Sequence, residues 1–161
     1  MLFRSVPKPP NFLYDVKRFC HKVFAQLEAL KEHDQFYWLD ADVEMVEAPP
    51  LELLEEILGK SFVSFLGRNT YSETGVIAFN GKHPDFDEFI SRYGDCYNKW
   101  LIFNLPYWTD CHAFDWARSG GGNNLTPVGF GVDNVLPDSS LGRYMVHHKG
   151  RLKLQMEEQS E

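Results

Sequence analysis

The sequence predicts an α/β fold, built as a single domain in which a small mixed sheet is flanked by helices. Short apolar runs of strand character alternate along the chain with longer segments whose apolar residues recur every three or four positions. The chain has 161 residues, of which 43% are hydrophobic and 15% aromatic, and this suits one domain with a substantial core. We expect the domain to cover residues 1–154 and the polar residues 155–161 to form a disordered tail.

The first predicted helix and strand open the domain. Apolar residues over 12–30 step by three and four, which predicts a helix that buries one face and leaves Lys17, Lys22 and Glu28 on the other. The continuous aromatic run at 36–39 then predicts a strand buried on both faces, as in a parallel or mixed sheet.

The remaining predicted elements continue this alternation. A pair of prolines predicts the start of a helix over residues 51–58, and Gly59 is placed to end it. Apolar runs predict strands at 61–66 and 75–79, and a last strand near 143–147. Between these strands, apolar periodicity predicts helices over 84–100 and 110–118.

Composition excludes several classes of function. Sixteen basic residues against 23 acidic ones give a formal charge of −7, so we expect no general binding to nucleic acid, which requires a basic surface. No apolar run approaches the roughly 18–20 residues of a membrane span. The three cysteines have no C-x-x-C spacing, which favours a reducing compartment and a cytoplasmic location.

The sequence Asp40-Ala41-Asp42 directly follows the aromatic strand. Two carboxylates at the carboxyl end of a strand can share a divalent cation, because α/β sheets place their ligands at that edge. A second D-x-D, Asp85-Phe86-Asp87, opens a predicted helix, where acidic residues complement the helix dipole. Only Asp40 and Asp42 are therefore candidates for a metal site, with capping of a loop as the alternative.

A basic, histidine-containing segment near the end of the chain could complete such a site. Its pattern H-x-x-G-x-x-K consists of His147, Gly150 and Lys153, with His148 as the alternative ligand. A histidine can ligate a cation, while a glycine amide and a lysine suit a diphosphate. The mixed oxygen and nitrogen ligands favour Mn²⁺ over Mg²⁺, although Mg²⁺ remains possible. A solvated basic strand end is the alternative.

These motifs together resemble the second half of a GT-A glycosyltransferase, most closely the retaining glycogenin and galactosyltransferase group. The resemblance covers roughly residues 12–153 and depends on the strand F-Y-W-L, the D-A-D, the stretch S-E-T-G-V-I-A-F-N and the H-x-x-G-x-x-K. It implies that UDP or a UDP-sugar binds with Mn²⁺. The implied roles are ribose or metal for Asp40, metal for Asp42 and His147, and diphosphate for Gly150 and Lys153.

The chain departs from the GT-A pattern before the D-x-D. Only 35 residues precede Phe36, which leaves room for one helix, whereas these enzymes place their nucleotide-binding βαβ units there. We therefore expect a minimal, truncated GT-A-like domain. The strand at 36–39 then becomes an aromatic sheet edge, and we expect a homo-oligomer that covers it.

Two further carboxylates are candidates for catalysis. By the resemblance, Glu73 lies beside the donor sugar and an unknown acceptor, and Asp110 lies near the reacting centre; the alternatives are an exposed turn and a helix N-cap. Tyr107 and Trp108 suit stacking on a sugar. The predicted function is Mn²⁺-dependent binding of UDP or a UDP-sugar with glycosyl transfer. The alternatives are a non-catalytic nucleotide- and metal-binding module and a weak nucleotide-sugar hydrolase.

Overall fold

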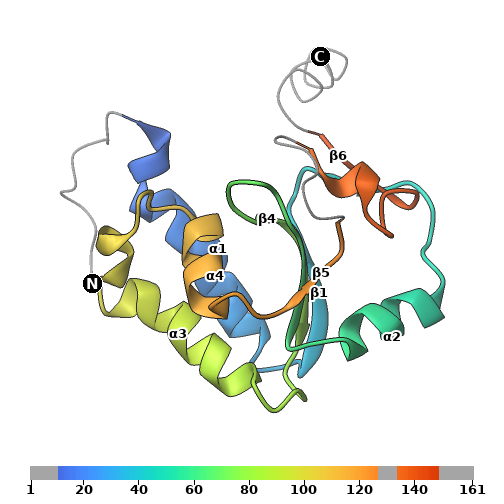
Figure 1. Cartoon of the computed structure of the whole chain (residues 1–161), viewed down its shortest axis with the longest axis horizontal. Helices are drawn as coiled ribbons and strands as arrows, with labels where there is room; N and C mark the ends of the chain where they lie inside the picture. The colour runs from blue at the N-terminus through green and yellow to red at the C-terminus, as the bar shows by residue number, and fades with distance from the viewer. Residues whose placement is uncertain (1–10, 127–133, 149–161) are drawn as a thin grey trace.

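The computed structural model describes residues 11–126 and 134–148, and within them it confirms an α/β architecture. The sheet lies between two layers (Figure 1): α1, α3 and α4 cover one face, and α2 with a small two-stranded sheet covers the other. The helices are α1 (Val16–Ala29), α2 (Leu51–Gly59), α3 (Phe86–Asn98) and α4 (Asp110–Arg118), with 3₁₀ turns η1 (Phe12–Tyr14), η2 (Leu101–Asn104) and η3 (Leu136–Asp138).

The central sheet has four strands in the order β1-β4-β3-β5. β1 (Gln35–Leu39) and β3 (Val63–Leu66) both pair antiparallel with β4 (Glu73–Asn80), while β5 (Asn123–Asn124) runs parallel to β3. The sheet is therefore mixed, as the sequence predicts. β4 begins two residues earlier than the apolar run at 75–79 suggests, and all eight of its residues are buried.

β1 lies at one end of this strand order, so it is an edge strand among the residues that the structure describes. Its five residues are all half-buried, so the prediction that this strand is buried on both faces is wrong. An edge strand keeps solvent along one side of its backbone, and this limits how far its side chains can be buried. Phe36 still stacks on Phe79 of β4 at 5.0 Å between ring centroids.

The larger core lies between the sheet and the three-helix layer. Aromatic rings fill it: Phe89 of α3 stacks on Tyr93 at 5.6 Å, and both contact Phe114 of α4 edge-on. α4 spans the residues that the periodicity predicts, whereas α3 ends at Asn98 and not at residue 100. Each apolar helix stripe thus faces the sheet, which explains why these segments fold as helices.

The opposite layer contains a strand that the sequence analysis missed. β2 (Val43–Met45) pairs antiparallel with β6 (Met145–His147), and Val43 lies opposite His147. α2 packs beside this two-stranded sheet over a smaller core (Figure 1). Gly59 is the last residue of α2 and Lys60 is its C-cap. None of the described helices is long and apolar enough to cross a membrane.

Candidate functional site

Pairing of β2 with β6 brings together two residues that lie 105 positions apart in the sequence. Nε2 of His147 lies 3.1 Å from Oδ1 of Asp42. A backbone hydrogen bond keeps the two segments together beside this contact, since the amide of His148 donates to the carbonyl oxygen of Asp42 at 2.8 Å. The D-x-D and the C-terminal histidine, which the sequence analysis assigned to one metal site, are therefore neighbours.

The imidazole of His147 is fixed against the backbone of β4. A Cβ atom on Gly75 would lie 2.4 Å from Cε1 and 2.9 Å from Nδ1 of His147, so only glycine leaves room for this ring. His147 is 3% exposed, and its Nδ1 is buried without a hydrogen-bond partner among the described residues. Burial lowers its pKa despite the nearby Asp42 and Asp40 carboxylates. The ring is therefore held neutral, which is the form that binds metal.

Asp40 lies in a second cluster centred on Lys22 of α1. Nζ of Lys22 is 2.8 Å from both carboxylate oxygens of Asp40 and 2.9 Å from Oδ2 of Asp110, the first residue of α4. Thr74 of β4 accepts from Lys22 at 3.1 Å and donates to Asp110 at 2.6 Å. The indole N–H of Trp38 donates to Asp40 at 2.9 Å. Residues from β4, α4 and the end of β1 thus meet around one ammonium group of α1.

The charges of this cluster are compensated internally. Burial would lower the pKa of Lys22, but Asp110 and Asp40 together raise it above the ordinary lysine value. Burial would likewise raise the pKa of Asp110, but Lys22 and the Thr74 hydroxyl lower it. Lys22 is therefore charged and Asp110 ionised at neutral pH. The adjacent Cys111 thiol is neutral, because burial raises its pKa to about 12.

Lys22 is the site residue that the sequence analysis missed. It was predicted on the outer face of the first helix, yet its side chain is 15% exposed and directed at two carboxylates. A signal was present, since Lys22 precedes the buried Val23 and lies four positions before the buried Gln26, one turn away on the same helix. Apolar periodicity alone counts a lysine beside a buried stripe as solvent-facing.

Glu73 does not lie in an exposed turn and Asp110 is not a helix N-cap, which were the alternatives to a role in the site. Glu73 is 4% exposed and is the first residue of β4, not part of an exposed turn. Its Oε2 pairs with Arg68 at 2.8 Å, and its Oε1 accepts from the amide of Gly75 at 3.1 Å. The N-cap of α4 is Thr109, whose hydroxyl accepts from the amide of His112, so Asp110 does not serve as the cap.

The predicted metal ligands fit a divalent cation in part. Asp42 and His147 offer one oxygen and one nitrogen donor that converge, whereas Asp40 is engaged by Lys22. His148 pairs with Glu44 at 2.8 Å. Among residues 11–126 and 134–148, no three His, Cys, Asp or Glu side chains are grouped as a ready metal site. Gly150 and Lys153, the predicted diphosphate contacts, lie outside the described residues.

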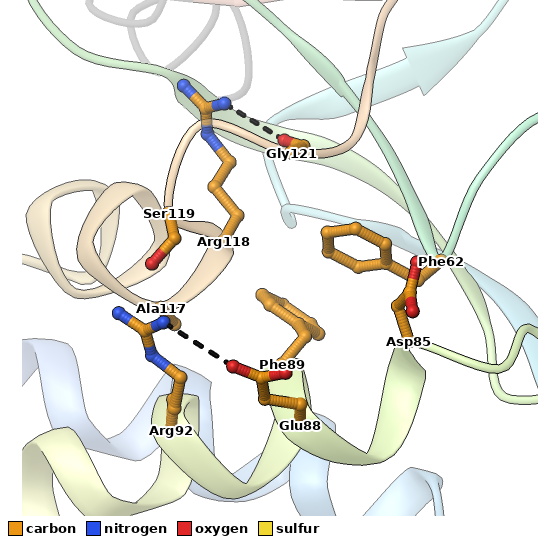
Figure 2. A pocket seen from close by; sticks show the side chains of 9 residues that line it. All are labelled: Phe62, Asp85, Glu88, Phe89, Arg92, Ala117, Arg118, Ser119 and Gly121. Atoms are coloured by element: carbon orange, nitrogen blue, oxygen red, sulfur yellow. Dashed lines mark hydrogen bonds and ion pairs between the residues drawn. The ribbon is translucent and has the colours of Figure 1, made fainter.

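A cavity of about 220 Å³ lies elsewhere, between α3 and the end of α4 (Figure 2). None of the predicted site residues lines it. Arg92 reaches Glu88 at 3.8 Å and donates to the carbonyl oxygen of Trp116, while Arg118 donates to the carbonyl oxygen of Gly121 (Figure 2) and to Asp115. The two guanidinium groups thus already have partners, so we attach no function to this cavity.

We compared the chain with known families, proteins and structures. The chain matches no protein family profile, no curated protein and no solved structure. The site is therefore interpreted from its own residues.

Proposed function

We propose that this chain is a glycosyltransferase-like protein that binds UDP or a UDP-sugar together with a divalent cation, Mn²⁺ in preference to Mg²⁺. The observation that carries the proposal is the contact between Asp42 and His147, which joins both halves of the predicted metal site. Asp42 and His147 would hold the cation. Once bound, it would act as a Lewis acid toward the leaving diphosphate.

The Lys22 cluster would serve the sugar side of the same site. Lys22 fixes Asp40 and Asp110 by direct ion pairs, so both carboxylates keep one orientation. Asp110 stays ionised and would accept a hydrogen bond from an acceptor hydroxyl. Glu73, held by Arg68, could position further hydroxyl groups. These residues would then support transfer of the sugar to an acceptor.

A non-catalytic nucleotide- and metal-binding module is the second candidate. It is favoured by the same Lys22 contacts, because they leave Asp40 and Asp110 paired before any ligand binds. A weak hydrolase, with water as the acceptor, is the third. Release of free sugar from a UDP-sugar without added acceptor would identify the hydrolase, and transfer to an added acceptor would identify the transferase.

Metal binding can be tested on the two adjacent histidines. We expect the electron paramagnetic resonance signal of free Mn²⁺ to fall when protein is added, because bound Mn²⁺ loses the sharp spectrum of the hydrated ion. His147→Gln should weaken this binding at least tenfold, whereas His148→Gln, a matched control one residue away, should leave it within twofold. Circular dichroism checks that both variants are folded. Equal binding by His147→Gln and wild type would contradict the proposed ligand set.

A further inference from the structure

We propose that the acceptor is an extended, uncharged glycan that binds along a row of aromatic side chains leading away from the candidate site. This inference rests on the proposed function and names its acceptor class. We define the aromatic row as the six rings Tyr71, His112, Tyr107, Tyr14, Trp108 and Phe103.

The rings of the aromatic row contact one another in sequence. Adjacent centroids are separated by 4.9 Å, 5.1 Å, 5.8 Å, 5.2 Å and 4.7 Å from Tyr71 through to Phe103. Tyr14 belongs to η1, Phe103 to η2 and His112 to α4, while Tyr107 and Trp108 lie between η2 and α4 and Tyr71 precedes β4. Figure 1 shows η1, η2 and the start of α4 gathered at one end of the helical layer. The amide of Trp108 donates to the carbonyl oxygen of Leu13 at 2.9 Å, which joins two of these segments.

One end of the row lies at the ion pair between Arg68 and Glu73. The guanidinium carbon of Arg68 lies 4.7 Å from the Tyr71 ring centroid, and the same guanidinium pairs with Glu73. Nε of Arg68 is buried without a hydrogen-bond partner among the described residues. His112, the second ring, lies two residues after Asp110 on α4. A chain bound along the row would therefore place its end beside the Arg68–Glu73 ion pair and the start of α4.

The surface chemistry of the row suits a sugar chain. Tyr107 is 37% exposed and Phe103 is 41% exposed, while the other four rings are half-buried, so the row is accessible yet fixed by packing. Burial lowers the pKa of His112, and no other member of the row carries a charge at neutral pH. Tyrosine and tryptophan offer an apolar face with a polar edge at low entropic cost, which matches the apolar faces and rim hydroxyls of a pyranose.

The test is a glycan array followed by titration of the best-binding oligosaccharide, monitored by tryptophan fluorescence. We expect wild type to retain oligosaccharides of three or more residues more tightly than the corresponding monosaccharides. Tyr107→Ala should weaken the affinity at least tenfold, and Tyr107→Phe, which keeps the stacking face, should restore it to within threefold. Phe12→Ala, which removes a more exposed aromatic outside the row, should leave affinity unchanged.

Other outcomes overturn the inference. Failure of wild type to retain any array glycan would do so, as would equal affinity in Tyr107→Ala and wild type. Self-association that Tyr107→Ala abolishes, without glycan binding, would reassign the row to a protein interface. UDP titration in the presence of Mn²⁺ is run on the same samples. Its failure alongside glycan binding would refute the proposed function and leave the aromatic row as a glycan site.

Discussion

At the residue scale, Lys22 is the centre of the second cluster of the candidate site, which contains Asp40 and Asp110. Its side chain holds Asp40 and Asp110 at 2.8–2.9 Å in a largely buried setting, so its removal would leave a buried carboxylate without compensation. Breaking a buried ion pair by deleting one partner costs about 3–5 kcal/mol, far more than an exposed pair contributes. The Lys22 cluster therefore contributes strongly to the free energy of unfolding, and it also fixes the positions of the two carboxylates.

We therefore expect Lys22→Met to lower the free energy of unfolding by about 3–5 kcal/mol at pH 7 in urea denaturation. Lys31→Met, which removes an exposed pair with Glu28, should change it by less than about 1 kcal/mol.

In wild type the lowered pKa of Asp110 gives a contribution to stability that is lost as pH falls through that pKa. In Lys22→Met the burial of Asp110 is no longer offset by the ammonium group and raises the pKa of Asp110. The loss of unfolding free energy caused by Lys22→Met should therefore shrink as the pH falls from 7 to 5. A loss that grows over this range would contradict the account.

At the element scale, the contact between β4 and β6 positions His147, the histidine that we propose as a metal ligand. The His147 ring lies over Gly75, at a point where any Cβ would overlap it. The glycine in S-E-T-G-V-I-A-F-N is therefore explained by packing of one strand against another element. Its effect should appear in stability and in binding together.

Gly75→Ala should lower the free energy of unfolding by roughly 1–3 kcal/mol through overpacking and weaken Mn²⁺ binding by displacing His147. Gly59→Ala is the matched control, because a Cβ there has no atom within 4 Å and alanine favours the helix. It should raise stability by about 0.5–1 kcal/mol and leave binding intact. Equal Mn²⁺ affinity in Gly75→Ala and wild type would show that this packing does not position the ligand.

At the scale of the whole molecule, the sequence predicts the layers better than the connections between them. The α/β class and the bounds of α4 follow from local periodicity, which each segment carries by itself. β2 was missed because three residues make a weak local pattern and its partner lies about 100 positions later. Lys22 was misplaced for a similar reason, since its carboxylate partners belong to other elements. The pairing of β2 and the position of the Lys22 side chain both depend on partners far away in the sequence. Local patterns in a single sequence do not identify such partners.

The edge strand β1 gives a prediction at the same scale. The amide of Asp40 donates to Gly75, so alternation turns the amides of Gln35, Tyr37 and Leu39 away from β4. We expect a homodimer formed by pairing of this edge with a second copy, measured by sedimentation equilibrium. Gln35→Pro removes one outward amide and should weaken the dimer at least tenfold. Gln35→Leu, which loses only the side-chain bond to Asn80, should not. A monomer at all concentrations would refute this prediction.

The central claim is that Asp42 and His147 form a cation-dependent nucleotide site, and calorimetric titration of UDP tests it most directly. We predict that UDP binds wild type with Mn²⁺ and at least tenfold more weakly without it. Asp42→Asn should abolish the Mn²⁺-dependent part, whereas Asp87→Asn, in the D-x-D that opens α3, should bind like wild type. UDP binding that is absent, independent of Mn²⁺ or unchanged in Asp42→Asn would contradict the account.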